Sequence, residues 1–174
     1  MLDAKRQSGQ CRYPYLANIN VQWFRLDLAA LNQMDFDDDD RVEFALNDGD
    51  LLVCEGGEVG RCAIWHNDLA NCYFQKAIHR VRCNRETIIP EYLGYSFFYH
   101  SQQNGFSDIV GTKSTIAHLP GDKLRNMQIV VPPMEQQIRF RQYVEQADKS
   151  KLAIRQSLES LEKSRNALMN QIFG

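Results

Sequence analysis

Residues 132–174 have the sequence PPMEQQIRFRQYVEQADKSKLAIRQSLESLEKSRNALMNQIFG, and this stretch decides the fold of the chain. A proline suits the first turn of a helix but lacks the amide hydrogen that a strand ladder needs. Glu135 follows in that turn, where the helix dipole is positive. No further proline or glycine occurs before Gly174. The sequence therefore predicts one long helix over residues 133–174, spanning on the order of 57 Å up to Ile172 at about 1.5 Å per residue.

The apolar residues of this helix follow the spacing of a coiled-coil seam, in which steps of three and four residues alternate. Lys151 and Arg165 interrupt the seam, and polar residues at such positions fix the register of a coiled coil at some cost in stability. The apolar seam positions, which are the predicted dimer contacts, are Val144, Ala147, Ile154, Leu158, Leu161, Leu168 and Ile172.

The predicted seam has no mate within the chain, because no second stretch has the pattern of a long helix. We therefore expect a second copy of the chain or a different subunit to cover it. The alternative is that the helix folds back across its own domain, since amphipathic helices commonly serve their own core. A homodimer through antiparallel helices is the arrangement we expect.

The composition fits one domain with an extension. Of 174 residues, 44% are hydrophobic and 24% are charged, which is ordinary for a globular protein. Residues 1–132 carry 13 Lys and Arg against 17 Asp and Glu, a balance of −4, whereas residues 133–174 carry 7 against 5, a balance of +2. Charge alone therefore does not identify residues 1–132 as a nucleic-acid domain. The acidic run at 37–40 with Asp35 is predicted to be a solvated loop.

No segment of the sequence suggests secretion or a membrane. No stretch approaches eighteen consecutive apolar residues, and the first ten residues lack the apolar centre of a signal peptide. We expect a cytoplasmic protein. The five cysteines contain no C-x-x-C pair, so free buried thiols are favoured over a zinc site with His66 or His79.

The rest of the chain predicts mainly strands. A turn signal at residues 47–49 precedes the apolar run LLVC at 51–54, and the glycines that follow favour a hairpin with residues 59–65. The fold class is therefore α+β: a mainly-β domain over 1–132 followed by a long coiled-coil helix. The other predicted elements are strands at 13–21, 72–83 and 127–131, a helix at 90–103 and a helical turn after Pro120-Gly121.

Catalytic motifs are not visible in the sequence. It contains no G-x-S-x-G elbow, no phosphate loop ending in G-K-[ST], no H-E-x-x-H and no dinucleotide fingerprint. Gly56, Gly57 and Gly60 could cradle a phosphate, but glycines in a hairpin more often supply positive φ.

Chemistry suited to DNA is better represented. Amide side chains can pair with adenine, Lys and Arg with guanine, and small hydroxyls with phosphate oxygens. The basic strand at 72–83 and the loop after Gly111 carry such groups, although charges on a strand are often only solvated. The candidate DNA-binding residues are Gln75, Lys76, Arg80, Thr112, Lys113 and Ser114, with Arg82 on the same predicted strand.

Five stretches together resemble the specificity subunits of type I restriction-modification enzymes. They occur in the order of that family and cover nearly the whole chain. They are GDLLVCEGG at 49–57, VGR at 59–61, CYFQKAIHRVR at 72–82, GTKSTIAHL at 111–119 and IVVPPMEQQ at 129–137.

The resemblance implies that residues 1–132 form a target-recognition domain that reads one half of a bipartite site in double-stranded DNA. Residues 133–174 would be the spacer helix that docks the modification (methyltransferase) subunits. It also implies that this chain is not catalytic and binds no cofactor. S-adenosylmethionine would be used by the modification subunit, and ATP with Mg²⁺ by the restriction subunit.

The full family pattern has two recognition domains and two spacer helices, whereas this sequence has one of each. It therefore resembles a half-subunit, and two copies would restore the layout. The alternative from another functional class is a coiled-coil interaction adaptor whose globular part does not read DNA.

Overall fold

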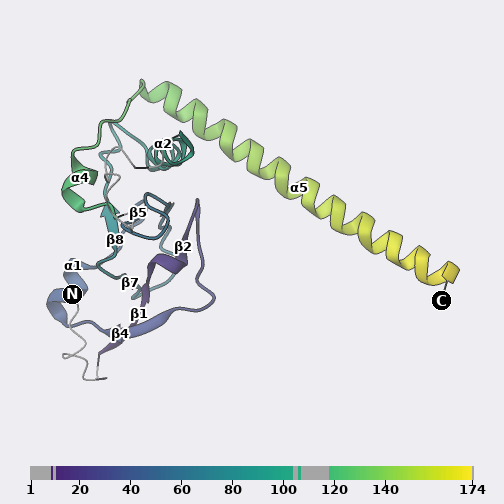
Figure 1. Cartoon of the computed structure of the whole chain (residues 1–174), viewed down its shortest axis with the longest axis horizontal. Helices are drawn as coiled ribbons and strands as arrows, with labels where there is room; N and C mark the ends of the chain where they lie inside the picture. Colours follow the sequence, from purple (N-terminus) through teal and green to yellow (C-terminus); the bar gives the residue numbers. More distant parts are fainter. Residues whose placement is uncertain (1–8, 10, 104–105, 107–117, 174) are drawn as a thin grey trace. The chain divides into compact units, whose positions relative to one another are not determined.

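The computed structural model describes residues 9, 11–103, 106 and 118–173 (Figure 1). They divide into two compact units, Met1–Pro132 and Pro133–Gly174, which we call the head and the helix unit. The head combines short sheets with helices, and the helix unit is one long helix. The α+β class predicted from the sequence is confirmed.

Strand β5, Leu51–Cys54, is the centre of the head. It pairs antiparallel with β6, Cys62–Ile64, on one side and with β8, Ile78–Val81, on the other, giving the sheet order β6-β5-β8. All four β5 residues are buried, because Leu52 and Cys54 face one hydrophobic core while Leu51 and Val53 face another. The prediction of a buried strand and a hairpin at LLVC is confirmed.

A second sheet and a small hairpin complete the β structure. Strand β1, Arg12–Leu16, lies between β4, Asn32–Asp35, and β7, Tyr73–Phe74, antiparallel to the former and parallel to the latter. Strands β2, Val21–Gln22, and β3, Arg25–Leu26, pair antiparallel. The first core is rich in aromatic rings, and Phe36 stacks on Tyr73 with 4.7 Å between ring centroids.

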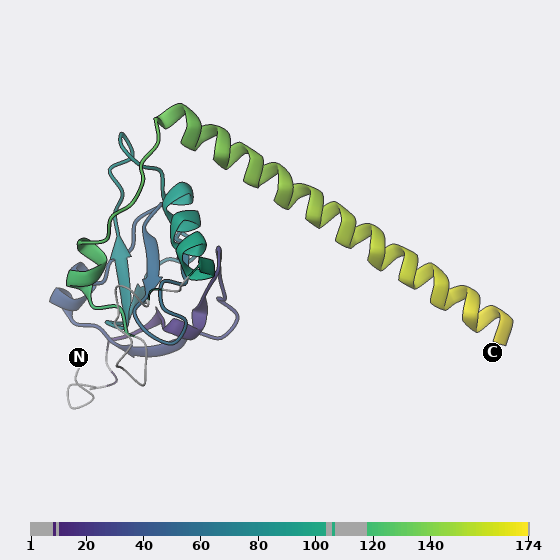
Figure 2. The same cartoon turned by 45° about the horizontal axis from the view of Figure 1, so that its top comes forward.

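Helix α2, Pro90–Gln103, packs against the central sheet, as its position beside the strands in Figure 2 shows. Its buried residues Leu93 and Phe97 join the second core. The prediction of a helix over 90–103 is confirmed. A short helix, α4, spans Gly121–Arg125 and confirms the predicted helical turn.

The predicted strand at 13–21 is wrong beyond Leu16. A 3-10 helix, η2, occupies Asn18–Asn20. The Asn20 side chain accepts a hydrogen bond from Ala17 N and donates to Asp27 O. These local bonds offer the backbone an alternative to a strand ladder, and strand pairing resumes only at Val21.

Two further strand predictions are also wrong. Residues 72–83 do not form one strand, because a turn closed by the bond from Ile78 N to Gln75 O separates β7 from β8. Residues 127–131 form no strand; Met127 and Ile129 pack on the second core without joining a ladder. The apolar pattern is met by two paired strands in the first stretch and by packing without a ladder in the second.

The acidic run is also not the loop that was predicted. Helix α1, Asp38–Glu43, begins there, and Asp37 caps it by accepting a hydrogen bond from Asp40 N at 2.8 Å. Asp38, Asp39 and Asp40 occupy the first turn, where negative charge is stabilised by the helix dipole.

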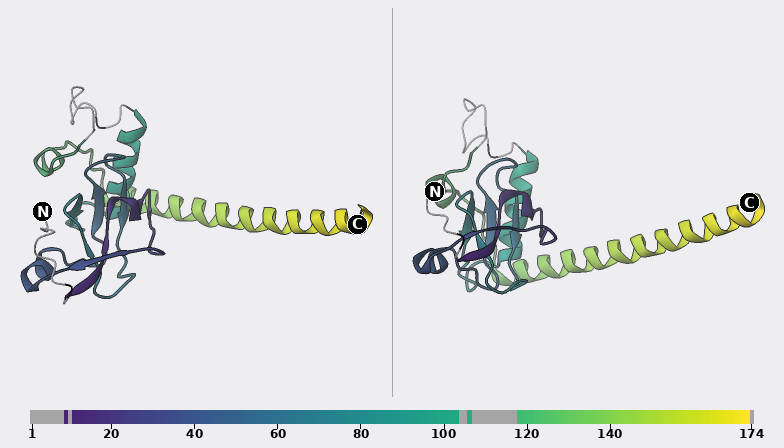
Figure 3. Two further views of the ribbon diagram at one scale, coloured as in Figure 1. Left: turned by 60° about the horizontal axis from the view of Figure 1, so that its bottom comes forward. Right: turned by 90° about the horizontal axis from the view of Figure 1, so that it is seen from below.

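Helix α5, Met134–Phe173, forms the helix unit and is unbroken over 40 residues (Figure 3). It begins where predicted, with Gln136 N and Gln137 N both bonded to Pro133 O. Its length is about 60 Å at 1.5 Å per residue. Within the described part of the chain, neither α5 nor any other helix combines the length and apolarity that crossing a membrane requires.

Two glycines of the β5–β6 hairpin allow a matched test of why glycine is needed. Both have positive φ, +73° at Gly57 and +80° at Gly60, but a Cβ at Gly57 meets nothing within 4 Å, whereas a Cβ at Gly60 would overlap the Phe106 ring. We predict that Gly60→Ala lowers the free energy of unfolding by about 2–4 kcal/mol, and Gly57→Ala by only about 1–2 kcal/mol. Urea unfolding followed by tryptophan fluorescence measures both, because Trp23 and Trp65 lie in the head. Equal losses for the two variants would contradict the packing explanation.

Candidate functional site

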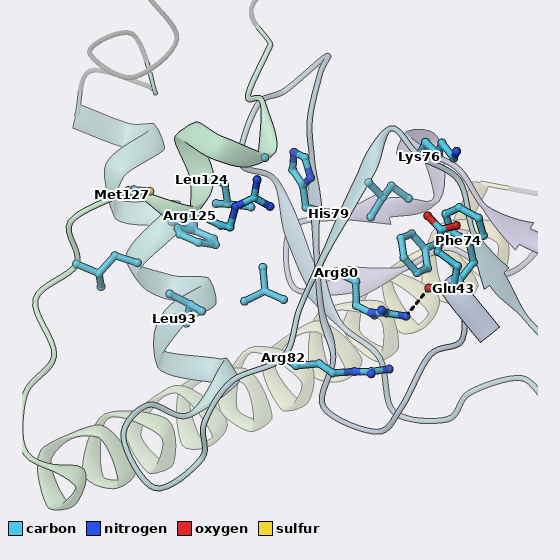
Figure 4. A pocket seen from close by; sticks show the side chains of 16 residues that line it. Glu43, Phe74, Lys76, His79, Arg80, Arg82, Leu93, Leu124, Arg125 and Met127 are labelled. Carbon is cyan, nitrogen blue, oxygen red and sulfur yellow. Dashed lines mark hydrogen bonds between the residues drawn. The ribbon is translucent and has the colours of Figure 1, made fainter. Parts of the chain in front are cut away.

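A groove of about 780 Å³ runs along β8, which is an edge strand of the central sheet (Figure 4). Neighbouring β8 residues line it from both faces of the sheet, with Ile78 and Arg80 on one face and His79 and Val81 on the other. A cavity that receives side chains from both faces of an edge strand must lie along that edge. We call it the β8 groove. Residues of α1, α2 and α4 complete its walls.

Arg80 is anchored within the head. Its guanidinium donates to Glu43 O at 2.9 Å and also to Ala45 O, and it lies 5.4 Å over the Phe74 ring. Burial, followed by the nearby charge of Arg82, lowers the pKa of Arg80 from its usual value. Arg80 therefore ties the end of α1 to β8, because it satisfies carbonyl groups that a helix C-terminus leaves open.

Arg82 is anchored in a similar way. Its Nε lies 2.9 Å from Asp50 Oδ1, and its Nη2 donates to Ala45 O at 3.3 Å. Asp50 is only 2% exposed and also accepts a hydrogen bond from Asn47 N at 2.8 Å. A buried carboxylate needs such partners, so the Arg82–Asp50 pair connects the segment that follows β8 to the turn that enters β5.

Gln75 and Lys76 do not lie on the same strand as Arg80, contrary to the prediction, because both are in the β7–β8 turn. Lys76 is exposed, and its ammonium group lies 5.8 Å over the Phe44 ring. Of the candidate DNA-binding residues that the structure describes, Lys76 has the most accessible charge. Thr112, Lys113 and Ser114 lie outside the described residues.

The α4 side of the β8 groove carries residues that sequence reasoning missed. Arg125 is exposed and lines the groove, and His79 Nε2 lies 2.7 Å from Leu119 O. Glu55 Oε1 lies 3.9 Å from His79 Nε2 and 3.5 Å from His118 Nδ1. No local motif marks Arg125, since its place at the groove depends on α4 packing near β8.

The five cysteines are free thiols that differ in burial. Cys54, Cys62 and Cys72 are free and buried, as predicted, whereas Cys11 is exposed and Cys83 is half-buried. Burial raises the pKa of the Cys72 thiol to about 11 and that of Cys83 to about 11, which keeps both protonated near neutral pH. Among the described residues, no three His, Cys, Asp or Glu side chains are placed to hold a metal ion.

The helix unit contains no second element that could cover the seam residues of α5. This holds for residues 134–173, all of which the structure describes. Ile154, Leu158, Leu161, Leu168 and Ile172 are 56–68% exposed, Ala147 is exposed and Val144 is half-buried. Leucine and isoleucine exposed in such a regular row are unusual for a surface without a partner.

A small α+β head joined to a single long helix defines the chain as a two-unit protein. Comparison with known proteins gives the family: residues 12–163 match the model of the type I restriction modification DNA specificity domain, and the chain belongs to this family. That match extends through both units.

A curated protein and a solved structure are also similar to the chain. The chain is 23% identical over 176 residues to a putative type I restriction enzyme MjaX specificity subunit of Methanocaldococcus jannaschii, covering 99% of this chain and 41% of that protein. It also resembles a solved structure from work on complex assembly and conformational transition of the type I R-M system. The TM-score is 0.61 at 15% identity, covering 94% of this chain and 42% of that one, which supports the fold. The chain thus spans about two fifths of both relatives.

Arg80 and Lys76 allow a test of which groove cation maintains the fold. We predict that Arg80→Ala lowers the free energy of unfolding by about 2–3 kcal/mol, because two carbonyl groups lose a charged donor. Lys76→Ala should change it by less than about 0.5 kcal/mol, since the ammonium is exposed. Urea titration followed by tryptophan fluorescence compares the two variants. An Arg80→Ala protein as stable as the unmodified chain would refute the anchoring role.

Proposed function

We propose that this chain is the DNA-reading and spacing part of a type I specificity subunit, in which the head contacts one half of a bipartite DNA target. The observation that carries the proposal is the family match, because it runs through the head and most of α5. The helix then serves to hold two heads apart and to dock methyltransferase subunits. In this proposal the chain is not catalytic and binds no cofactor, and partner subunits use S-adenosylmethionine and ATP with Mg²⁺.

Support for DNA contact in the head centres on the β7–β8 turn. Lys76 presents an exposed ammonium there, and Gln75 is next to it. Thr112, Lys113 and Ser114 add hydroxyl and cationic groups of the kind that bind phosphates. The head as a whole carries a balance of −4, so its attraction to DNA depends on local charge and on basic partner subunits.

One observation favours the adaptor alternative. Arg80 and Arg82 lie in the stretch that the sequence predicts to contact DNA, but both donate hydrogen bonds within the head, to Glu43 O and Asp50 Oδ1. Cations held by bonds within the head are less available to phosphates, which would suit protein binding better than DNA binding. The two functions differ in whether the chain directs methylation to a defined sequence.

That difference gives the test of the proposed function. We predict that the chain, produced with a cognate type I methyltransferase subunit in a host without other DNA methylation, directs methylation to one bipartite motif. The two half-sites should be identical and inverted, because a C2 dimer presents the same head twice. Base-resolution methylome sequencing of a plasmid reads the outcome, and random or absent methylation contradicts it.

We also predict an effect of Lys76→Ala on DNA binding by the purified complex. This change should weaken DNA binding and reduce the slope of log affinity against log salt concentration by about 1, whereas Lys149→Ala on α5 should do neither.

The homodimer that we propose can be specified by register. If Leu158 faces Leu161 of an antiparallel second copy, Ile154 faces Arg165, Lys151 faces Leu168, and Ala147 faces Ile172. Every seam position between 147 and 172 then has a counterpart, and symmetry repeats each pair. Polar seam residues meet apolar ones instead of each other.

Charges beside the seam favour this register. Arg155 and Glu162 follow the seam residues Ile154 and Leu161 and occupy the same edge of the seam. In the proposed register Arg155 lies opposite Glu162 of the second copy, twice by symmetry. Shifting the pairing by seven residues brings Arg155 opposite Arg155, or Glu162 opposite Glu162. Like charges at the flanks of a coiled coil disfavour such alternatives.

We predict that Arg155→Glu weakens self-association severalfold, corresponding to about 1 kcal/mol over the two symmetric contacts, and that Arg155→Glu with Glu162→Arg restores it. Sedimentation equilibrium of the full chain measures the dissociation constants. Lys163→Glu on the outer face of the helix is the matched control and should have little effect.

Leu158→Asp with Leu161→Asp should abolish pairing, because each would bury an unpaired charge. Failure of the charge swap to restore association would overturn the register, whereas a chain that is monomeric at every concentration would overturn the homodimer itself.

A further inference from the structure

The outer edge of β8 has backbone groups available for pairing. Glu55 N bonds to Ala77 O, while Cys54 uses its own N–H and C=O toward Arg61 and Gly60 on the β6 side. Bonding alternates along an antiparallel pair, so Ile78 and Arg80 direct their backbone groups away from β5. Within the described ranges, nothing is bonded to Ile78 O or to the backbone N–H and C=O of Arg80.

The β8 groove lies along this open edge and has the lining that an extended chain requires. Apolar side chains line both sides of the groove. Phe74 lies on the side of α1, near Glu43, and Leu124 of α4 lies on the opposite side of β8 (Figure 4). Residues of an added strand would alternate between these two sides. The groove therefore offers main-chain bonds along β8 and apolar contacts to alternate side chains.

The charged side chains of the groove are mainly positive, which favours an acidic ligand. Of the lining residues that the structure describes, four are cations and one is a carboxylate: Lys76, Arg80, Arg82 and Arg125 against Glu43. Asp50 neutralises Arg82, but Arg125 has no ion-pair partner among the residues described. Charged side chains on an edge strand deter indiscriminate pairing, and positive charges deter an acidic strand least.

We propose that the β8 groove binds an extended acidic segment of a partner protein, which adds to the central sheet as a strand beside β8. This mode of recognition takes affinity from main-chain hydrogen bonds and specificity from alternate side chains. A DNA backbone is a poorer fit, because phosphates only accept hydrogen bonds and would leave the outward carbonyls of Ile78 and Arg80 unpaired. The proposal does not depend on DNA reading by the head.

The test uses a blocked, dye-labelled hexapeptide of alternating glutamate and valine, with the full chain, in fluorescence anisotropy. We expect saturable binding that is lost when alternate peptide nitrogens are methylated, because N-methylation removes backbone donors but leaves the charge unchanged. Arg125→Glu should weaken binding at least tenfold. Lys123→Glu is the matched control, since Lys123 is exposed on the same helix but does not line the groove.

Each outcome decides the proposal. No binding up to millimolar chain, or equal binding of the N-methylated peptide, overturns strand addition. Equal weakening by Arg125→Glu and Lys123→Glu shows general charge attraction and also overturns it. If a labelled DNA duplex displaces the peptide and Arg125→Glu loses the duplex as well, the groove is a DNA surface and the peptide proposal is wrong.

Discussion

Burial of β5 on both faces is the constraint on which the head depends. Its side chains alternate between two hydrophobic cores, so the strand must lie at the centre of a sheet with helices and loops on each side. That position leaves β6 and β8 as the two edges. Because β8 is an edge strand, a groove with access to its backbone can form beside it. The β8 groove therefore exists because burial of β5 on both faces leaves β8 at the edge of the sheet.

The same constraint explains why the basic residues in and beside β8 differ in role. Asp50 lies immediately before β5 and is buried with it, so its carboxylate requires a cationic partner, which Arg82 supplies. Arg80 reaches the carbonyl groups at the end of α1. Lys76, in a turn beyond the sheet, keeps its ammonium exposed. Arg80 and Arg82 lie close to the core and stabilise the head, whereas Lys76 lies farther out and remains available to a partner.

Helix α5 obeys a different constraint. A helix of 40 residues with a regular apolar seam gains little from its own backbone propensity, and packing of the apolar face supplies most of the stability of such helices. Lys151 and Arg165 within the seam, and Arg155 and Glu162 beside it, restrict which pairings are tolerated. In the function that we propose, this restriction sets the distance between two heads along DNA.

The sequence by itself determined the elements whose signals are local: α5 from its proline start and heptads, β5 from its apolar run, α2 from Pro90, and the family from ordered motifs. It did not determine the break between β7 and β8, the helix at the acidic run, or the groove beside Arg125. Only tertiary structure decided the groove, because it depends on contacts between residues distant in sequence, whereas the turn bond from Ile78 N to Gln75 O and the Asp37 cap are local contacts that apolar periodicity does not report. Periodicity reports which residues are buried, whereas pairing partners and cavities arise when separate segments pack together.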